Sequence, residues 1–304
     1  MKIATTTLDF GSFCNTDVER IRELHRAGFR YIDLSMYEFT PDSVYMQDNW
    51  KDEVYKIKNV ADELGMTFVQ AHSQGGNPIS DDPSHADFHF RATVRSIEIC
   101  SMLGIKNTVS HMGIKDGLSK EEWFDLNKSA LKKFFPYMEH YGVNLLCENA
   151  AHSLLRGRYY ISSGKDMREY IKYVDHPQYH GCWDTGHANC DGNQYDEIMA
   201  IGDELYAIHY NDNHGAMDDH IAPFLGTLNH DEIISALIDV GFGGYFTLEC
   251  VNSLITYDQW QGKRRRFDSA SKLREPQLFM QRHMEAMMYD TAEWMLKEYG
   301  IFEK

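Results

Sequence analysis

Carboxylate and imidazole side chains recur in this chain directly after short apolar segments. The stretch "GCWDTGHANCDG" (181–192) places Asp184 three residues before His187. A carboxylate at the end of a buried segment costs free energy unless a cation or a proton compensates its charge. Asp and His are also residue types that bind divalent metals and transfer protons. The chemistry of Asp184 therefore depends on which side chains end the other apolar segments.

Six apolar segments in succession end in an acidic or a histidine side chain. They read "QAHS", "VSHMG", "LLCENA", "CWDTGH", "AIHYNDN" with "DDH" just beyond it, and "FTLEC", and none contains Lys or Arg. Carboxylates that converge on one place repel one another unless protons or a metal ion intervene. The side chains concerned are His72, His111, Glu148, Asp184, His187, His209, Asp218, Asp219, His220 and Glu249.

A metal site follows if the ends of these segments meet in the fold. Glu148, Asp184, His209 and Glu249 come from four successive segments. Together they supply the oxygen and nitrogen ligands that suit a divalent cation, and we predict that they hold one ion. His72 and His111, each considered alone, fit a hydrogen-bonded core position as well as a ligand position. Ordinary structural or surface roles are expected for His25, His85, His89, His140, His180, His230 and His283.

The chain alternates short β-branched or aromatic segments with longer amphipathic ones. Alternation of this kind implies parallel strands that are joined by right-handed crossovers. The candidate strands cover 2–10, 29–36, 67–73, 107–112, 143–149, 180–187, 205–212 and 244–250. Apolar residues three and four apart, with Gly at several ends, predict helices over 17–28, 51–65, 121–142, 230–242 and 276–300.

Two α/β folds compete for this pattern. A doubly wound sheet usually has a Gly-rich phosphate turn after its first strand, but "LDFGSFCN" has only one Gly. Eight strand–helix units in 304 residues fit instead a single (β/α)8 TIM-barrel domain over 1–304. The active site of such a barrel lies at the carboxyl ends of its strands. The barrel therefore predicts that the acidic and histidine ends share one rim.

Composition limits the partners of the protein. The formal net charge of −16 argues against nucleic acid, whose binding depends on cations that displace counterions from phosphates. The basic cluster "GKRRRFD" (262–268) is expected to be a solvated loop. No segment approaches the ~20 apolar residues of a membrane span, and the first residues lack the pattern of a secretory signal. Six Cys without CxxC spacing are typical of reduced core thiols, so we expect a cytoplasmic protein.

Essentially the whole chain resembles the xylose-isomerase-like barrel superfamily. Members of this superfamily include sugar isomerases and epimerases, inosose dehydratases and the endonuclease IV type of nuclease. The resemblance is most specific in "DTGHAN" (184–189), in "HYNDNHGAMDDHIAPFLGTLN" (209–229), and in the two strand-end glutamates Glu148 and Glu249.

The epimerase branch of this superfamily suggests a role for each matching residue. The resemblance implies that Glu148, Asp184, His209 and Glu249 bind one divalent ion, most often Mn²⁺, with Mg²⁺, Co²⁺ or Zn²⁺ as alternatives. It also implies that His187 contacts substrate oxygens. The two glutamates would flank the substrate carbon and exchange its proton.

On this interpretation the protein is a metal-dependent sugar isomerase or epimerase. A sugar or keto-sugar substrate would bind the ion through adjacent oxygens. Glu148 and Glu249 would remove and return the proton next to the carbonyl through a metal-stabilised enediolate. Arg156 and Arg158 would suit a phosphate or carboxylate group of the substrate. The residues expected to contact substrate are His187, His72, His111, His220, Arg156 and Arg158.

Other functions stay open from the sequence. Lyases of the superfamily use the same proton abstraction; they are keto-inositol dehydratases, and C-glycoside deglycosidases that act on 3-keto glycosides with a small β-rich partner subunit. The endonuclease branch usually has "DTCH" where this chain has Gly186. A barrel without catalysis is disfavoured by the intact quartet, and a homo-oligomer stays open. The nine zinc-binding residues of the endonuclease branch would fall on His72, His111, Glu148, Asp184, His187, His209, Asp218, His220 and Glu249.

Overall fold

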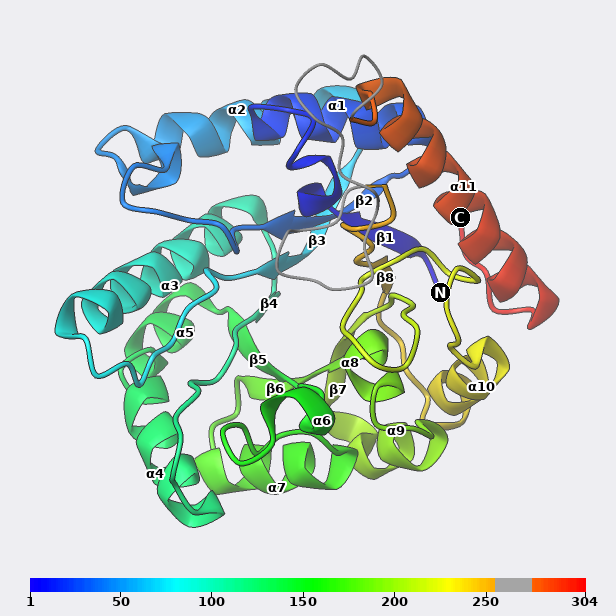
Figure 1. The fold of residues 1–304 in the computed structure, drawn as a ribbon. Coiled ribbons are helices and arrows are strands. Elements are labelled where there is room, and N and C mark those ends of the chain that lie inside the picture. The colour runs from blue at the N-terminus through cyan, green and yellow to red at the C-terminus, as the bar shows by residue number, and fades with distance from the viewer. Residues whose placement is uncertain (255–274) are drawn as a thin grey trace.

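The computed structural model describes residues 1–254 and 275–304. These residues form eight strands around a central axis, with helices on the outside (Figure 1). The basic segment 262–268, predicted as a solvated loop, lies outside the described residues. The strands are β1 (Ile3–Thr6), β2 (Tyr31–Ser35), β3 (Thr67–His72), β4 (Asn107–Val109), β5 (Asn144–Glu148), β6 (Tyr179–Asp184), β7 (Leu205–His209) and β8 (Phe246–Leu248).

The strands pair in parallel and close into a barrel. Their order is β7-β6-β5-β4-β3-β2-β1-β8, so each strand lies beside its sequence neighbour and β1 joins β8. A parallel bridge between Tyr210 and Leu248 closes the remaining gap between β7 and β8. The Tyr210 amide donates to the Thr247 carbonyl over 2.7 Å, and the Glu249 amide donates to the Tyr210 carbonyl over 3.1 Å. The predicted (β/α)8 barrel is confirmed.

Local sequence signals explain where the main helices begin and end. Thr16 caps α1 by accepting from the Glu19 amide, and the Glu19 side chain accepts from the Thr16 amide in return. Gly28 then ends α1 with a φ of 113°, which favours glycine. None of the described helices is long and apolar enough to cross a membrane. The helices are α1 (Asp17–Ala27), α2 (Trp50–Leu64), α3 (Pro83–Leu103), α4 (Lys120–Leu131), α5 (Phe135–Tyr141), α6 (His152–Leu155), α7 (Gly164–Val174), α8 (Thr185–Asn189), α9 (Tyr195–Ile201), α10 (His230–Asp239) and α11 (Leu278–Glu298), with 3-10 turns η1 (Thr7–Phe10), η2 (Val44–Met46) and η3 (Gly202–Glu204).

The single helix predicted over 121–142 is wrong, because the structure divides it. Helix α4 ends at Leu131 and α5 begins at Phe135, so that Pro136 lies in the first turn of α5. Proline has no amide hydrogen and its ring clashes with the preceding turn, so it is tolerated only at a helix start. The apolar periodicity continues across the break, which is why the pattern alone suggested one helix.

All eight strands are shorter than the segments predicted for them, and two of the early ends shape the rim of the barrel. The segment predicted as a strand over 2–10 leaves the sheet after Thr6 and turns into η1. The segment predicted over 180–187 ends at Asp184, where α8 begins. These two early ends place Leu8 and His187 on the rim of the barrel instead of inside the sheet.

The apolar core lies between the strands and the surrounding helices. Tyr170, Trp183 and Phe246 are among its largest fully buried side chains. A second, smaller apolar cluster consists of Val109, Leu146, Cys182 and Ala207 from four neighbouring strands. The carboxyl ends of the same strands carry buried acids and histidines instead. The core of the barrel is therefore apolar, whereas the carboxyl ends of its strands carry ionisable side chains.

Two buried acids also meet where α11 packs on the start of the chain. Asp9 of η1 and Glu285 of α11 are 2% and 0% exposed, and their carboxyl groups are hydrogen-bonded to each other. Thr5 lies between them, with its hydroxyl 3.3 Å from Asp9 Oδ2 and 3.5 Å from Glu285 Oε2. Burial raises the pKa of Asp9 to about 7 and that of Glu285 well above its ordinary value. The buried arrangement is therefore stable while the two carboxyl groups share a proton.

This pair predicts a stability that falls as the pH rises. An acid whose folded pKa is raised keeps its proton in the folded state while the unfolded chain loses it, so the folded state loses stability from about pH 4 to pH 7. In Glu285→Gln the amide donates to Asp9 without a shared proton. We expect this variant to be more stable than wild type at pH 8 by ~2–4 kcal/mol. Urea unfolding between pH 5 and pH 8 measures the difference, and Glu298→Gln on the exposed face of α11 is the control. Parallel pH profiles of wild type and Glu285→Gln would contradict the shared proton.

Candidate metal and catalytic site

Four side chains of the predicted quartet converge at the carboxyl rim of the barrel. Glu148 ends β5, Asp184 ends β6, His209 ends β7, and Glu249 directly follows β8. One ligand atom from each of the four lies within 4.8 Å of every other. All four side chains are 10% exposed or less. The structure thus brings together the residues that the sequence placed on successive strands.

His209 lies between the two glutamates. Its Nδ1 is hydrogen-bonded to Glu148 Oε1 and lies 3.3 Å from Glu249 Oε2. The opposite ring nitrogen, Nε2, lies 3.4 Å from Oδ2 of Asp33, which is fully buried in β2. The Gln70 side chain donates to the same Asp33 oxygen over 3.1 Å. Nδ1 is therefore the ring nitrogen that faces the cluster, and Asp33 contacts the back of the ring.

The local sequence around Asp184 explains its orientation. Asp184 is the N-cap of α8, and its Oδ1 accepts from the His187 amide over 2.6 Å. The Asn211 side chain donates to the other carboxylate oxygen over 2.8 Å. A Cβ on Gly186 would lie 1.8 Å from Asn211 Oδ1, so a side chain there would displace the residue that orients Asp184. This contact explains why the motif reads "DTGH" in this chain.

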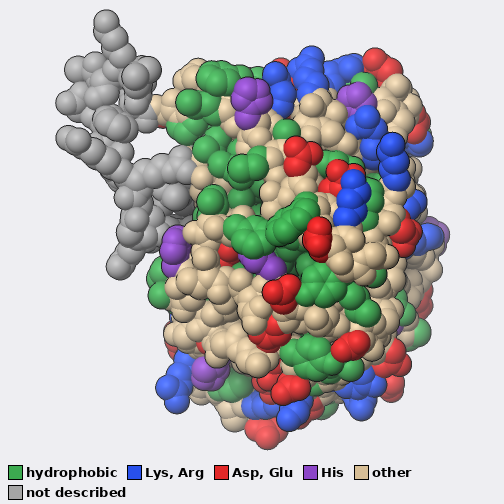
Figure 2. Space-filling view, turned by 90° about the vertical axis from the view of Figure 1, so that its right-hand side faces the viewer, with side chains coloured by type: hydrophobic (Ala, Val, Ile, Leu, Met, Phe, Trp, Pro, Cys, Tyr) green, Lys and Arg blue, Asp and Glu red, His purple; other side chains and the backbone are tan. Residues whose placement is uncertain are grey.

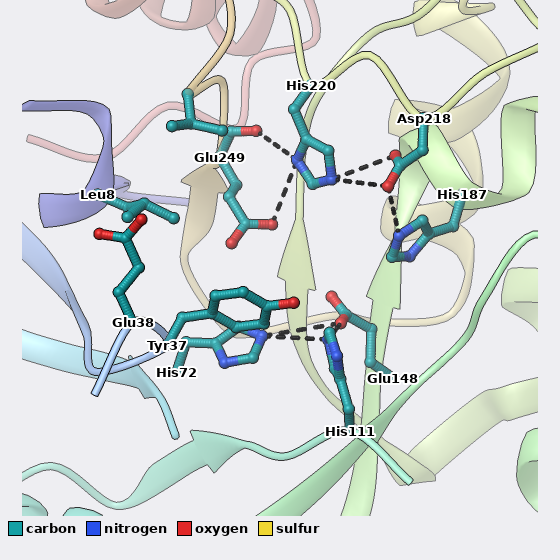
Figure 3. Close-up of a pocket in the computed structure, with 11 residues that line it drawn as sticks. Leu8, Tyr37, Glu38, His72, His111, Glu148, His187, Asp218, His220 and Glu249 are labelled. Carbon is teal, nitrogen blue, oxygen red and sulfur yellow. Dashed lines mark hydrogen bonds and ion pairs between the residues drawn. The ribbon is translucent and has the colours of Figure 1, made fainter. Parts of the chain in front are cut away.

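A second group of acids and histidines adjoins the quartet. Asp218 accepts from His187 Nε2 over 3.0 Å and from His220 Nε2 over 3.1 Å (Figure 3). On its other side, His220 Nδ1 lies 3.5 Å from Glu249 Oε2. Asp184, His187 and His220 also have ligand atoms close enough to hold an ion. This second group and the quartet share Asp184.

The long segment after β7 is folded so that it delivers these side chains. Asp212 accepts from the amides of Gly226 and Leu228, each over 2.9 Å, and forms an antiparallel bridge with Ile221. His220, next to this bridge, has a φ of 47°, in the left-handed region. The His220 side chain, far along this segment, is therefore returned to the rim beside Glu249.

His72 and His111 complete the other side of the rim. His111 Nε2 is 2.6 Å from Glu148 Oε2, and His72 Nε2 is 3.3 Å from His111 Nε2. His72 Nδ1 is 2.8 Å from the Ser73 carbonyl, which fixes the orientation of its ring. Burial lowers the pKa of His72. His72, Glu148 and His209 form a third group with ligand atoms close enough for an ion.

The surroundings shift the pKa values of the two glutamates in opposite directions. Burial raises the pKa of Glu249 to about 8, and the nearby Glu148 and Asp184 charges add to this effect. Burial acts in the same sense on Glu148, but His209, His111 and His72 hold its pKa well below the ordinary value. One glutamate therefore carries a proton and the other a charge. A divalent cation could replace that proton as the compensating positive charge.

The second group is held by ion pairs. Burial alone would lower the pKa of His220, but Asp218 raises it to about 10. His187 behaves in the same way, because Asp184 and Asp218 outweigh burial and raise its pKa well above the ordinary value. Both histidines in turn hold the pKa of Asp218 well below its usual range. At neutral pH Asp218 is therefore a carboxylate between two imidazolium rings.

The acids and histidines line a cavity of about 250 Å³, small among ligand pockets and suited to a compact solute (Figure 3). Among the described residues, its lining contains no Lys or Arg. Sequence reasoning missed the four lining residues that follow β1, β2 and β8, because they are not acids or histidines directly at a strand end. The lining consists of Leu8, Tyr37, Glu38, His72, His111, Glu148, His187, Asp218, His220, Glu249 and Val251.

The two arginines predicted to contact substrate lie outside the lining. Arg156 directly follows α6 and is exposed. Arg158 donates to the Leu154 carbonyl over 3.3 Å and lies 3.8 Å from Asp116. A role for either arginine in binding stays a prediction.

The donor set fits a divalent cation. Three buried carboxylates and one imidazole supply the oxygen and nitrogen ligands that Mn²⁺, Mg²⁺, Co²⁺ and Zn²⁺ accept. Asp33 behind His209 and Asn211 behind Asp184 are the kind of supporting contacts that orient metal ligands. The chemistry and the support of the cluster both match a metal centre.

The chain is thus a closed parallel barrel with a buried cluster of acids and histidines on its carboxyl rim that could hold a metal ion. The model of the xylose isomerase-like TIM barrel family matches residues 21–275, and the chain belongs to this family. Two curated relatives are similar in sequence but carry no assigned activity. One, protein MJ1311 of Methanocaldococcus jannaschii, is 29% identical over 134 residues, which span 43% of this chain and 45% of that protein. The other, protein y4fM of Sinorhizobium fredii, is 26% identical over 238 residues, 70% of this chain and 74% of that protein.

Solved structures share the fold at low sequence identity. A D-tagatose 3-epimerase-like protein has a TM-score of 0.68 at 22% identity, over 83% of this chain and 91% of that chain. D-psicose 3-epimerase from Clostridium cellulolyticum H10, solved with D-tagatose, has a TM-score of 0.73 at 15% identity, over 97% and 99%. A zinc-bound IolI protein has a TM-score of 0.75 at 15% identity, over 99% and 100%.

Proposed function

We propose that this protein is a metal-dependent epimerase or isomerase of a small uncharged sugar, in which Glu148 and Glu249 transfer the proton. The observation that carries the proposal is the placement of two buried glutamates on β5 and directly after β8, on either side of one cavity, with a shared histidine. Sugar epimerases with the same fold support it.

The two glutamates can serve as a base and an acid on opposite faces of a substrate. One carboxylate accepts the proton from the carbon next to the carbonyl, and the electron pair of that C–H bond moves into an enolate. The other carboxyl group then donates a proton to the same carbon from the opposite face, so the configuration inverts without net oxidation. A divalent ion bound by the quartet would supply Lewis-acid polarisation of the carbonyl.

The other residues of the cavity would bind and orient the sugar. Nε2 of His187 and Nε2 of His220 both donate to Asp218, and a sugar hydroxyl oxygen that enters the cavity could accept from these rings in place of Asp218. Leu8, Tyr37 and Val251 offer apolar surface against which a sugar ring can pack. Because the described lining has acids but no Lys or Arg, it favours an uncharged sugar over a sugar phosphate.

Solvent isotope exchange tests this proposal directly. The protein, loaded with Mn²⁺ after chelator treatment, is incubated in D2O with free ketohexoses and ketopentoses and with 3-keto glycosides. We expect deuterium at one carbon of a turned-over sugar, together with its epimer. A product that has lost a β-substituent identifies the lyase alternative instead. Absence of bound metal after equilibration with each of the four candidate ions would overturn the proposal.

Phosphodiester hydrolysis is a second candidate that one observation favours. Three overlapping groups of candidate ligands, seven residues in all, lie along the rim, and the endonuclease branch that the sequence resembles binds three ions there. The acidic lining opposes a polyanionic substrate. Counting bound ions by elemental analysis separates the two. One ion per chain supports the sugar chemistry, whereas three ions with nicking of an abasic duplex support the nuclease.

A further inference from the structure

The outer face of α11 carries an apolar stripe whose large side chains are about half exposed. Phe279, Met287 and Trp294 are 53%, 44% and 53% exposed. With His283 and Asp290 they are spaced four, four, three and four residues apart, so the five side chains lie along one side of the helix. The opposite side of α11 is buried against the barrel at Gln281, Glu285, Met288, Ala292 and Met295.

Hydrophobic side chains gather down the middle of this face of the molecule. Figure 2 views the molecule from the side on which α11 lies and shows these side chains interspersed with histidine and acidic groups. Phe224 and Leu225, from the segment after β7, extend the patch and are 54% and 46% exposed. The Phe224 ring lies 5.9 Å from the Trp294 ring. Exposed aromatic and methionine side chains in one contiguous patch are typical of a protein–protein interface.

The stripe is complementary to itself when it is reversed. Phe279 lies as far before the midpoint between Ala286 and Met287 as Trp294 lies after it. His283 and Asp290 are likewise equidistant from that midpoint. At 3.6 residues per turn, these four side chains point within about 30° of one direction. An antiparallel copy of α11 would therefore place an aromatic ring opposite an aromatic ring and a histidine opposite an acid.

We propose that two copies of this chain associate through α11, antiparallel about a two-fold axis between Ala286 and Met287. Phe279 packs against the partner's Trp294, and His283 pairs with the partner's Asp290. A two-fold interface requires that each contact occur twice with the roles exchanged, and the stripe meets this condition.

The local charge pattern of the stripe favours a second copy over an unrelated partner, although the net charge of the chain opposes association. The chain has a formal net charge of −16, so two copies repel unless the interface offsets the charge locally. The reversed alignment does so, because each Asp290 faces a histidine and no acid of the stripe faces another acid. A groove lined by Phe224, Leu228, Trp294 and Tyr299 adjoins the stripe and can receive the partner's Phe279. The inference does not depend on the proposed catalytic activity.

A charge swap tests the pairing. Sedimentation equilibrium of the full chain at micromolar concentrations is expected to show a dimer. His283→Asp would place acid against acid and Asp290→His would place histidine against histidine, so each is expected to raise the dimer Kd at least about tenfold. The double variant restores the pairs in exchanged positions and should return the Kd to within about threefold of wild type.

A symmetric cross-link provides an independent measurement. Met287→Cys places a thiol next to the proposed axis, and mild oxidation should give a disulfide-linked dimer on a non-reducing gel. The control is Leu126→Cys, which is exposed on α4. A wild-type monomer at 100 µM overturns the proposal. So does a dimer that neither single swap weakens, or a Met287→Cys variant that cross-links no faster than the control.

Discussion

Glu249→Gln is expected to abolish epimerisation, with kcat lowered by about 10²–10⁴, because an amide cannot accept or return a proton. Its oxygen can still contact the metal, so the loss should persist at saturating Mn²⁺. Glu148→Gln should have an effect of the same size. The measurement is turnover of the substrate identified by deuterium exchange, with bound metal quantified in each variant.

Isotope exchange distinguishes a lost base from a disturbed site. If each glutamate serves one face of the substrate carbon, Glu249→Gln still removes the proton of one epimer through Glu148. That epimer should therefore exchange its proton with D2O without inverting, and Glu148→Gln should do the same for the other epimer. Loss of exchange with both epimers in both variants, although metal binds normally, would contradict the two-base assignment.

Glu38→Gln is the matched control within the same cavity. Glu38 lines the cavity but lies outside the quartet, so its substitution should leave kcat within a few-fold of wild type and alter mainly KM. A kcat loss as large as that of Glu249→Gln would move the proton-transfer role away from the quartet.

The barrel and the quartet could be predicted because they follow from the order of strand and helix segments along the sequence. Strand–helix alternation fixes parallel pairing, and parallel pairing places every strand end on one rim. Glu148, Asp184 and His209 each end a strand, so their convergence followed from the sequence pattern. Whether they bind an ion depends on affinity, which the pattern does not contain, and this stays a prediction.

Contacts between distant segments could not be predicted. Asp33 lies in the middle of "YIDLS", where alternation shows an acid in a buried strand but not that His209 lies across the barrel. Asp9 and Glu285 meet only because α11 packs on the start of the chain. Tyr37 and Leu8 line the cavity from segments that follow strands without a strand-end acid or histidine. The signal at Pro136 was present in the sequence, but helical periodicity on both sides obscured it.

Asp33→Asn is expected to weaken metal binding about 10–100-fold, because a carboxylate behind a ligating histidine fixes its ring and raises its basicity. Asp33 Oδ2 lies 3.4 Å from His209 Nε2, and the Gln70 side chain donates to the same oxygen over 3.1 Å. An Asn side chain keeps the size and one oxygen but loses the charge. Isothermal titration of the metal-free variant with Mn²⁺ measures the affinity, and kcat at saturating Mn²⁺ should change much less than the Kd.

A merely structural role for Asp33 predicts a different pattern. Thr247→Val removes a hydroxyl 3.4 Å from Gln70 Oε1 and so perturbs the same buried layer without touching Asp33 or His209. If Asp33 acts through His209, Asp33→Asn weakens metal binding while Thr247→Val lowers only the melting temperature of the metal-free protein. Equal Mn²⁺ affinity in wild type and Asp33→Asn, with a lower melting temperature, would show that Asp33 supports the barrel but not the metal centre. The two variants thus separate a positioning contact from ordinary packing.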